Sequence, residues 1–190
     1  MDQLSDYDYQ LPAEMIASKP ARHRDEARML VVHRDSGKWE HRSVHEFTEY
    51  LRPNDAVVLN NTRVLPARLL GVRQKTGGRW EGLFLKVDED GHWRMLAKTK
   101  GKIEVGEDVI VKPAHDSESQ DELVLNLTEK GEAGYWTVRP NRNESYLDLL
   151  QMFGTMPLPP YMRKKLATER DFRRYQTTFA QRPGSVAAPT

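Results

Sequence analysis

The densest polar block in the chain, LNNTRVLPAR (59–68), places two amides, a hydroxyl and two guanidinium groups directly after a short apolar run. These polar residues are Asn60, Asn61, Thr62, Arg63 and Arg68. Loops that follow buried strands commonly present functional groups. The amides and the hydroxyl offer directional hydrogen bonds, and a guanidinium can hold an anion through two parallel hydrogen bonds. The block is therefore a candidate substrate-binding loop, and the alternative is an Asx-type turn with the arginines in salt bridges.

A second polar block, PARHRDEARM (20–29), crowds several charges into one predicted loop. A carboxylate beside an arginine can orient a ligand, or act as an acid or base whose pKa is tuned by its neighbour. We single out Arg24 and Asp25, with Asp25 as the candidate catalytic acid or base. Ion pairs that only stabilise the loop are the competing interpretation.

The third block is the end of the chain, YQTTFAQRPGSVAAPT (175–190). Tyr175, Gln176 and Thr177 could stack on a nucleic-acid base and hydrogen-bond to it. An ordinary buried tyrosine and a capped turn would account for the same residues. The run has no charged tail and no helix cap, so we expect a loop that is cut at Thr190, before its next element.

Composition excludes several other chemistries. The chain has no cysteine, which rules out disulfides, thiolate metal sites and cysteine nucleophiles. The histidines have no metal-ligand spacing, so we expect no metal, and the motifs of Rossmann, P-loop and serine-hydrolase proteins do not occur. The chain also lacks an apolar run of membrane-spanning length, and its acidic start is unlike a signal peptide. We therefore expect a cytoplasmic protein.

The net charge of +1 gives no global field that would attract nucleic acid, but the basic residues are clustered. Residues 62–80 and 94–102 carry basic groups without any acid, and residues 163–174 have an excess of them. One such run is usually a solvated face. Three separate runs in one chain favour a footprint for an anionic partner.

Three regions of the chain differ in pattern. Residues 1–66 mix elements: helices are predicted at 13–18 and 44–51, and buried strands at 28–33 and 56–60. Residues 67–142 are predicted to be all-β, a small barrel or sandwich. Its strands are expected at 69–75, 79–87, 92–98, 107–112, 122–129 and 134–139.

Residues 143–154 are predicted to be helical, with Asn143 as the cap and Gly154 at the end. The proline-rich MPLPPYM (156–162) cannot be regular. This order predicts an α+β or α/β protein with a discontinuous, barrel-like α/β domain, incomplete in this chain, at 1–66 and 143–190. An all-β small-barrel domain, 67–142, is inserted into it.

Taken together, the blocks resemble one family, the S-adenosylmethionine:tRNA ribosyltransferase-isomerases of queuosine biosynthesis. The matching segments are LSDYDYQLP (4–12), PARHRDEARMLVV (20–32), LRPNDAVVLNNTRVLPARLLG (51–71), GGRWEGLFL (77–85), MPLPPYM (156–162) and RYQTTFAQRPGSVAAPT (174–190). The resemblance covers essentially all 190 residues, but only about the first half of a family member. It departs at Asn61, where many members have an aspartate.

The resemblance implies transfer of the ribosyl part of S-adenosylmethionine to a 7-aminomethyl-7-deazaguanine in tRNA, followed by isomerisation to epoxyqueuosine. Adenine and methionine leave, so S-adenosylmethionine is a consumed co-substrate and no cofactor is needed. The partners are S-adenosylmethionine and a tRNA anticodon arm, with no membrane, and we expect a monomer. We expect these 190 residues alone to be inactive. The alternative is a stand-alone, non-catalytic RNA-binding module.

Placed on the family motifs, this chemistry assigns Asp25 to catalysis, because a base must remove a proton next to the sulfonium. We assign the remaining polar residues of the same motifs to stacking on the deazaguanine base, to recognising its edge, and to contacting tRNA phosphates. The residues assigned to substrate binding are Arg24, Asn60, Asn61, Thr62, Arg63, Arg68, Tyr161, Tyr175, Gln176, Thr177 and Thr190. Those assigned to tRNA phosphates are Arg163, Lys164 and Lys165.

Overall fold

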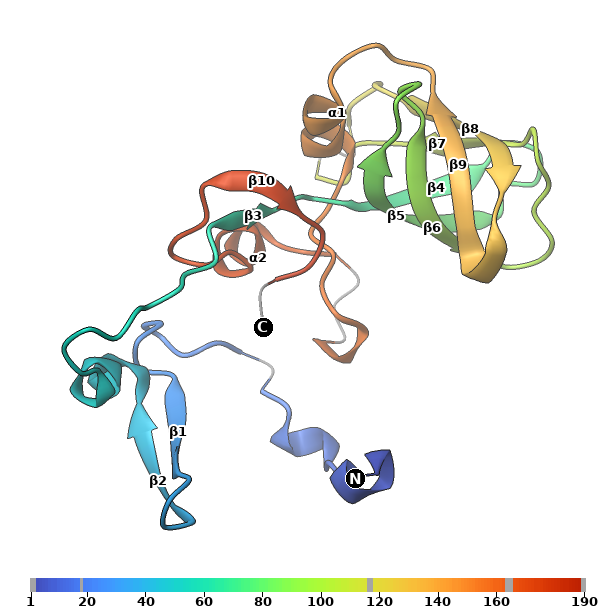
Figure 1. The fold of residues 1–190 in the computed structure, drawn as a ribbon. Coiled ribbons are helices and arrows are strands. Elements are labelled where there is room, and N and C mark those ends of the chain that lie inside the picture. Colours follow the sequence, from blue (N-terminus) through green and yellow to red (C-terminus); the bar gives the residue numbers. More distant parts are fainter. Residues whose placement is uncertain (1–2, 18, 116–117, 163–165, 189–190) are drawn as a thin grey trace. The chain divides into compact units, whose positions relative to one another are not determined.

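The protein is analysed as a computed structural model that describes residues 3–17, 19–115, 118–162 and 166–188. The chain divides into two compact units, Met1–Val58 and Leu59–Thr190. Figure 1 shows the elements of both units. The predicted domain boundaries at 66 and 142 stay a prediction. Among the residues described, no helix has the length and apolar character to cross a membrane.

The second unit contains a closed, antiparallel six-stranded barrel, which confirms the predicted small barrel. Around the barrel the strand order is β4-β5-β6-β9-β8-β7. The strands are β4 (Arg68–Arg73), β5 (Arg79–Val87), β6 (Trp93–Thr99), β7 (Asp108–Val111), β8 (Leu123–Lys130) and β9 (Tyr135–Pro140). A short 3-10 turn, Glu132–Gly134, precedes β9.

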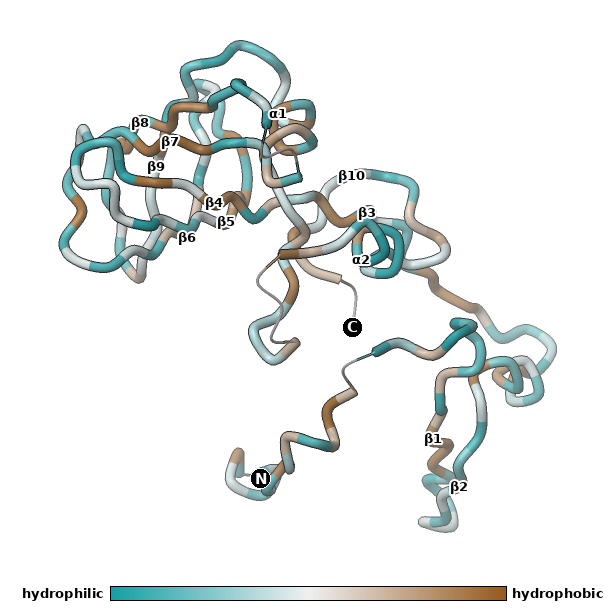
Figure 2. The backbone as a smooth tube through the Cα atoms, turned by 180° about the vertical axis from the view of Figure 1, so that it is seen from behind, coloured by the Kyte–Doolittle hydropathy of each residue, from teal (hydrophilic) through white to brown (hydrophobic). Residues whose placement is uncertain are grey.

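Alternation along each strand builds the barrel core, because successive side chains point to opposite faces. In β5, Trp80 and Phe84 are buried, whereas Glu81 and Leu83 between them are half-exposed. Gly82 shares the inner face, and a Cβ there would lie 2.1 Å from the Trp80 ring. Figure 2 shows hydrophobic stretches along the barrel strands, for example β7.

Helix α1 (Tyr146–Phe153) adds Leu149, Leu150 and Phe153 to the same core. The helix was predicted, but Ser145 rather than Asn143 is its cap, and the Ser145 hydroxyl accepts from the Asp148 amide at 3.2 Å. Asn143 lies two residues too early to reach the free amides of the first turn.

Gly154 follows α1 and is required by a close backbone approach. Its φ of −91° is not left-handed, so conformational freedom does not explain the glycine. A Cβ at this position would lie 1.9 Å from the Pro66 carbonyl oxygen. Just beyond it, Thr155 pairs with Arg68 through backbone hydrogen bonds of 3.1 and 2.8 Å. As predicted, 156–162 is irregular, with one 3-10 turn at Pro160–Met162.

In the first unit, β1 (Arg28–His33) and β2 (Lys38–Ser43) form an antiparallel hairpin. The helices are 3-10 helices at Leu4–Tyr7, Ala13–Met15 and Val44–Tyr50. The last begins as predicted, since Glu46 accepts from the Ser43 amide at 2.6 Å.

Two expectations for the first 66 residues are wrong. The strand at 28–33 exists but is not buried: Leu30 is 58% and Val32 57% exposed. Figure 2 accordingly shows hydrophobic residues along the hairpin. Residues 56–60 form no strand, and Val58 is 93% exposed. No described segment pairs with them, and an apolar run becomes a buried strand only where a neighbour supplies hydrogen bonds and cover.

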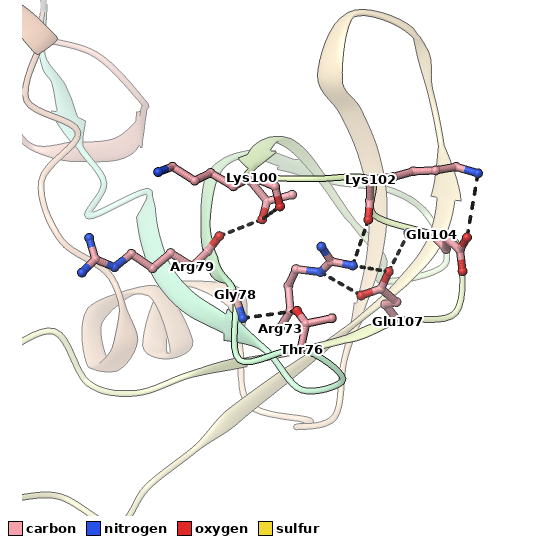
Figure 3. Close-up of polar contacts among 9 residues, drawn as sticks. Arg73, Thr76, Gly78, Arg79, Lys100, Lys102, Glu104 and Glu107 are labelled. Atoms are coloured by element: carbon pink, nitrogen blue, oxygen red, sulfur yellow. Dashed lines mark hydrogen bonds and ion pairs between the residues drawn. The ribbon is translucent and has the colours of Figure 1, made fainter.

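One buried ion pair locks the β4–β5 end of the barrel to the loop before β7 (Figure 3). Arg73 donates to both Glu107 carboxylate oxygens at 2.9 and 2.8 Å, and to the Lys102 carbonyl at 2.9 Å. Burial opposes ionisation of Glu107, but the hydrogen bonds from Arg73 and from the Glu104 amide outweigh it and hold the Glu107 pKa below its ordinary value.

We predict that Gly154→Ala destabilises the protein by about 2 kcal/mol or more, because a backbone carbonyl cannot move aside as a flexible side chain would. Urea unfolding followed by tryptophan fluorescence measures this. Gln151→Ala, on the exposed side of α1, is the control and should change stability by less than about 0.5 kcal/mol. Equal midpoints for the two variants would show that the contact with Pro66 relaxes freely.

We predict that Glu107→Gln costs about 3 kcal/mol at neutral pH, because it leaves the buried Arg73 charge uncompensated. Since the folded pKa of Glu107 is depressed, its contribution is present above the ordinary carboxyl pKa and is lost as pH falls through the folded value. The difference from wild type should therefore shrink on acidification. Glu104→Gln removes only an exposed pair, with Lys102 at 3.8 Å, and is the control. A pH-independent difference would contradict this assignment.

Candidate functional site

Two of the three polar blocks meet in the second unit. Strand β3 (Thr62–Val64) pairs in parallel with β10 (Arg182–Ser185), as Figure 1 shows. The Gln181 amide donates to the Asn61 carbonyl at 2.8 Å, and the Leu65 amide to the Ser185 carbonyl at 2.8 Å. The structure thus joins LNNTRVLPAR to the final segment, more than a hundred residues later in the chain.

Asn60 forms the turn that the sequence offered as the alternative interpretation. Its side-chain oxygen accepts from the Thr62 amide at 2.9 Å and from the Thr62 hydroxyl at 2.6 Å. Its carbonyl accepts from the Thr177 hydroxyl at 3.2 Å. The Asn61 side chain, by contrast, is exposed and makes no hydrogen bond to any described residue. Of the two amides, Asn61 is the one available to a ligand.

Gln176 holds β3 from the side opposite β10. Its amide oxygen accepts from the Val64 amide at 2.7 Å, and its amide nitrogen donates to the Val64 carbonyl at 2.9 Å. A side chain here replaces a neighbouring strand. In the structure, Gln176 therefore positions β3. Recognition of a base by Gln176 stays a prediction.

A short helix that the sequence analysis missed, α2 (Glu169–Arg174), delivers Tyr175 and Gln176 to β3. Thr168 caps it, because its hydroxyl accepts from the Asp171 amide at 3.3 Å, and the buried Asp171 carboxylate accepts in return from the Thr168 amide at 2.9 Å. The spacing of Thr168 and Asp171, a hydroxyl and a carboxylate three residues apart, is a capping signal that was readable in the sequence.

Tyr175 packs against a small core of Val64, Met156 and Ala167. Burial raises the pKa of Tyr175, the charge of Tyr161 raises it further, and a hydrogen bond with the Ala188 backbone opposes both. The Tyr175 phenol therefore stays protonated at neutral pH. Tyr161 itself is 60% exposed, as a side chain that stacks on a base would need to be.

The two arginines of the block differ in their surroundings. Arg68 makes a bidentate pair with Glu81 across the barrel surface, with distances of 3.0 and 3.1 Å. Arg63 lies on β3 next to the buried Val64, is exposed, and makes no ion pair or hydrogen bond through its guanidinium with any described residue. Arg63 is therefore the better candidate for holding an anion.

Arg24 and Asp25 belong to the first unit, and both are exposed. The Asp25 carbonyl accepts from the His45 amide at 3.0 Å, which fixes the loop to the start of a 3-10 helix. The Asp25 carboxylate makes no ion pair or hydrogen bond with a described residue, so no described arginine of this block pairs with it. The predicted phosphate contacts Arg163, Lys164 and Lys165, and also Thr190, lie outside the described residues.

The residues described include one group with the spacing of a metal site: Asp88, Asp90 and His92, in the turn between β5 and β6. The turn itself accounts for their proximity. The Asp88 carboxylate accepts from the amides of Asp90 and His92 at 3.2 and 2.9 Å, and Arg94 lies 3.7 Å away. This is the ordinary geometry of an aspartate-led turn.

We predict that Gln176→Ala exposes β3, because it removes both hydrogen bonds to Val64 and leaves two partly buried backbone groups without partners. Hydrogen exchange at the Val64 amide should become at least roughly tenfold faster, consistent with a loss of about 1.4 kcal/mol or more in local stability. Thr178→Ala, exposed two residues on, is the control. Unchanged protection at Val64 would show that Gln176 does not hold the strand.

The chain is similar to a known protein family and to curated enzymes. A family model described as "Queuosine biosynthesis protein" matches residues 4–190. The S-adenosylmethionine:tRNA ribosyltransferase-isomerase of Symbiobacterium thermophilum is 42% identical over 98% of this chain and 52% of its own length. The enzyme of the same name from Desulforamulus reducens is 36% identical over 99% of this chain and 52% of its own length.

A solved structure is also similar, the S-adenosylmethionine tRNA ribosyltransferase from Thermotoga maritima. It is 30% identical, covers 83% of this chain with 52% of its own length, and has a TM-score of 0.36. The chain spans about half the length of the curated relatives it matches. The resemblance found in the sequence is thereby confirmed, and the chain belongs to the S-adenosylmethionine:tRNA ribosyltransferase-isomerase family of queuosine biosynthesis proteins.

Proposed function

We propose that this chain supplies part of the substrate site of a tRNA-modifying enzyme. The reaction transfers the ribosyl part of S-adenosylmethionine to the aminomethyl group of 7-aminomethyl-7-deazaguanine in the anticodon arm of a tRNA. The ribose is isomerised to an epoxycyclopentane, giving epoxyqueuosine, and adenine and methionine leave. The observation that carries the proposal is the pairing of β3 with β10, because it unites two blocks through which the chain resembles its family.

The exposed groups around β3 suit recognition of a polar, partly anionic substrate. Asn61 offers both a donor and an acceptor to a base edge, and Arg63 offers a guanidinium to a carboxylate or phosphate. Tyr175, protonated at neutral pH, can act there only as a neutral phenol. Thr62 and Asn60 bond to each other and so fix where these neighbours lie. We assign binding to Asn61 and Arg63, and positioning to Asn60, Thr62 and Gln176.

Asp25 is the acid or base that we propose. The carbon next to a sulfonium is acidified, and a carboxylate that removes its proton must be free to approach it. Asp25 lies in the family block 20–32 and is exposed, and no described residue engages its carboxylate. We propose further that S-adenosylmethionine is a consumed co-substrate, that no cofactor is needed, and that the protein is a cytoplasmic monomer. Within an α/β domain of discontinuous sequence, β3 and β10 would be neighbouring strands.

The test follows adenine release from S-adenosylmethionine in the presence of tRNA that carries the 7-aminomethyl base. We expect no turnover from the 190 residues alone, because the relatives that carry the activity in their names are about twice as long. Fusing the remaining half of the Symbiobacterium thermophilum relative to residue 190 should restore turnover. In that fusion, Asp25→Asn should lower kcat by roughly 10²–10⁴-fold.

Arg63→Gln in the same fusion should raise KM with a smaller effect on kcat, since it removes binding that is shared by ground and transition states. Arg34→Gln, exposed on the hairpin turn of the first unit, is the matched control. Full activity of Asp25→Asn would remove Asp25 from the chemistry. Turnover by the 190 residues alone would show that they complete the site themselves.

A stand-alone RNA-binding module remains the second candidate, favoured by the closed barrel with its own core. Such a module would bind tRNA with and without the modified base equally well. If this second candidate is right, the fusion with the remaining half of the Symbiobacterium thermophilum relative should fold but release no adenine.

A further inference from the structure

Two basic runs that are separate in the sequence meet on the outside of the barrel. Arg79 ends the run 62–80, while Lys98 and Lys100 belong to the run 94–102. The register of β5 and β6 sets Trp80 opposite Thr99, and Glu81 opposite Lys98. The Thr99 hydroxyl also donates to the Arg79 carbonyl at 2.7 Å, which holds the two strand ends together.

These three cations line one groove of 440 Å³, which Leu70 and Gly71 of β4 also line. All three side chains are exposed, and none forms an ion pair with a described residue. The groove contains one acid, Glu81, and its carboxylate is held by Arg68 in the bidentate pair described above. The groove therefore carries a concentrated positive charge that the described protein does not neutralise.

Neighbouring basic residues are neutralised instead. Arg73 is buried against Glu107, and Lys102 lies 3.8 Å from Glu104. Figure 3 shows Arg79 and Lys100 extending to the same side, away from the Arg73–Glu107 pair, and Lys102 extending to the other side toward Glu104. Arg79 and Lys100 thus extend away from the two paired cations, Arg73 and Lys102.

We propose that this groove binds the phosphate backbone of an RNA strand, through Arg79, Lys98 and Lys100. The proposal rests on the proposed function for the identity of that RNA, a tRNA, and gives the barrel a role in holding it. Unpaired lysine and arginine along a groove match a line of phosphates, and the Leu70 side chain in the lining offers apolar contact to ribose. A closed barrel offers an extended acidic peptide no free strand edge to pair with, which favours RNA.

The test measures binding of unmodified tRNA to the 190-residue chain by fluorescence anisotropy over a series of salt concentrations, without S-adenosylmethionine. Arg79→Gln, Lys98→Gln and Lys100→Gln are combined in one variant. Each lost phosphate contact should lower the slope of log K against log salt by about 0.7–0.9, so the slope should fall by about 2–3. Affinity at about 0.1 M salt should fall roughly 10²-fold or more, since a slope change of about 2–3 acts over one decade of salt below 1 M.

The control variant combines Lys86→Gln, Lys102→Gln and Lys112→Gln, and loses the same charge. These lysines are exposed and lie outside the groove, and Lys102 and Lys112 are already paired with Glu104 and Glu122. Its affinity should stay within about threefold of wild type. Both variants change surface positions only, and equal urea midpoints verify that they fold.

If the groove variant and the control variant gave equal slopes of log K against log salt, the proposed RNA-binding role of the groove would be wrong, whether or not the enzyme is active. Displacement of the tRNA by poly-glutamate at equal charge concentration would overturn it in favour of an acidic protein partner. The readout involves neither the modified base nor turnover. Adenine release with an unchanged salt slope would therefore refute the groove alone, and groove binding without adenine release in the fusion would refute the enzymatic proposal alone.

Discussion

The close backbone contact between Gly154 and Pro66, continued by the pairing of Thr155 with Arg68, is the constraint on which the second unit depends. The chain enters the barrel through 65–68 and leaves it through 153–156, and this contact fixes entry and exit side by side. Because of it, segments that flank the barrel emerge together, and β3 can meet α2 and β10. A side chain at 154 would separate them, since two backbones cannot approach this closely around a Cβ. The site around β3 is thus a consequence of how the barrel closes.

Val64 shows how tightly this junction is specified. Its side chain is buried in the small core with Met156 and Ala167, and both of its backbone groups bond to Gln176. Since side chains alternate along a strand, burying Val64 forces Arg63 outward. The buried residue of the block therefore sets which of its neighbours is exposed. The sequence left two interpretations of this block open, a substrate-binding loop and a turn with salt bridges, and each applies to different residues. Asn60 and Arg68 form the turn and the salt bridge, while Asn61 and Arg63 remain available.

The strands of the barrel could be predicted from the sequence because their information is local: period-two alternation and glycine-rich turns mark six short strands. The pairings that close the barrel are not local, since β4 pairs with β7 and β6 with β9 across intervening strands. The pairing of β3 with β10 could not be predicted, since a parallel pair between distant segments leaves no local pattern in segments this short. Burial failed as a prediction for 28–33 and 56–60 for a related reason. Apolar composition states what a segment can bury, whereas Leu30 and Val58 are exposed because no described segment covers them. The Asp25 loop was found as a charged block, but its partners depend on tertiary placement that the sequence does not carry.

Arg68 connects the two proposed roles of the molecule. It lies at the entry to the barrel, its backbone pairs with Thr155, and its guanidinium occupies the carboxylate of Glu81. Glu81 in turn faces Lys98 across the β5–β6 ladder and lines the basic groove. Without Arg68, that carboxylate would be left to neutralise Lys98, and the groove would lose much of its excess charge. Replacing Arg68 could therefore weaken RNA binding without any contact between Arg68 and RNA, because a charge acts through the partner it releases as well as through the ligand it touches. The backbone of Arg68 also supports the geometry of the β3 site through its pairing with Thr155. Its main chain and its side chain therefore act on two different surfaces of the second unit.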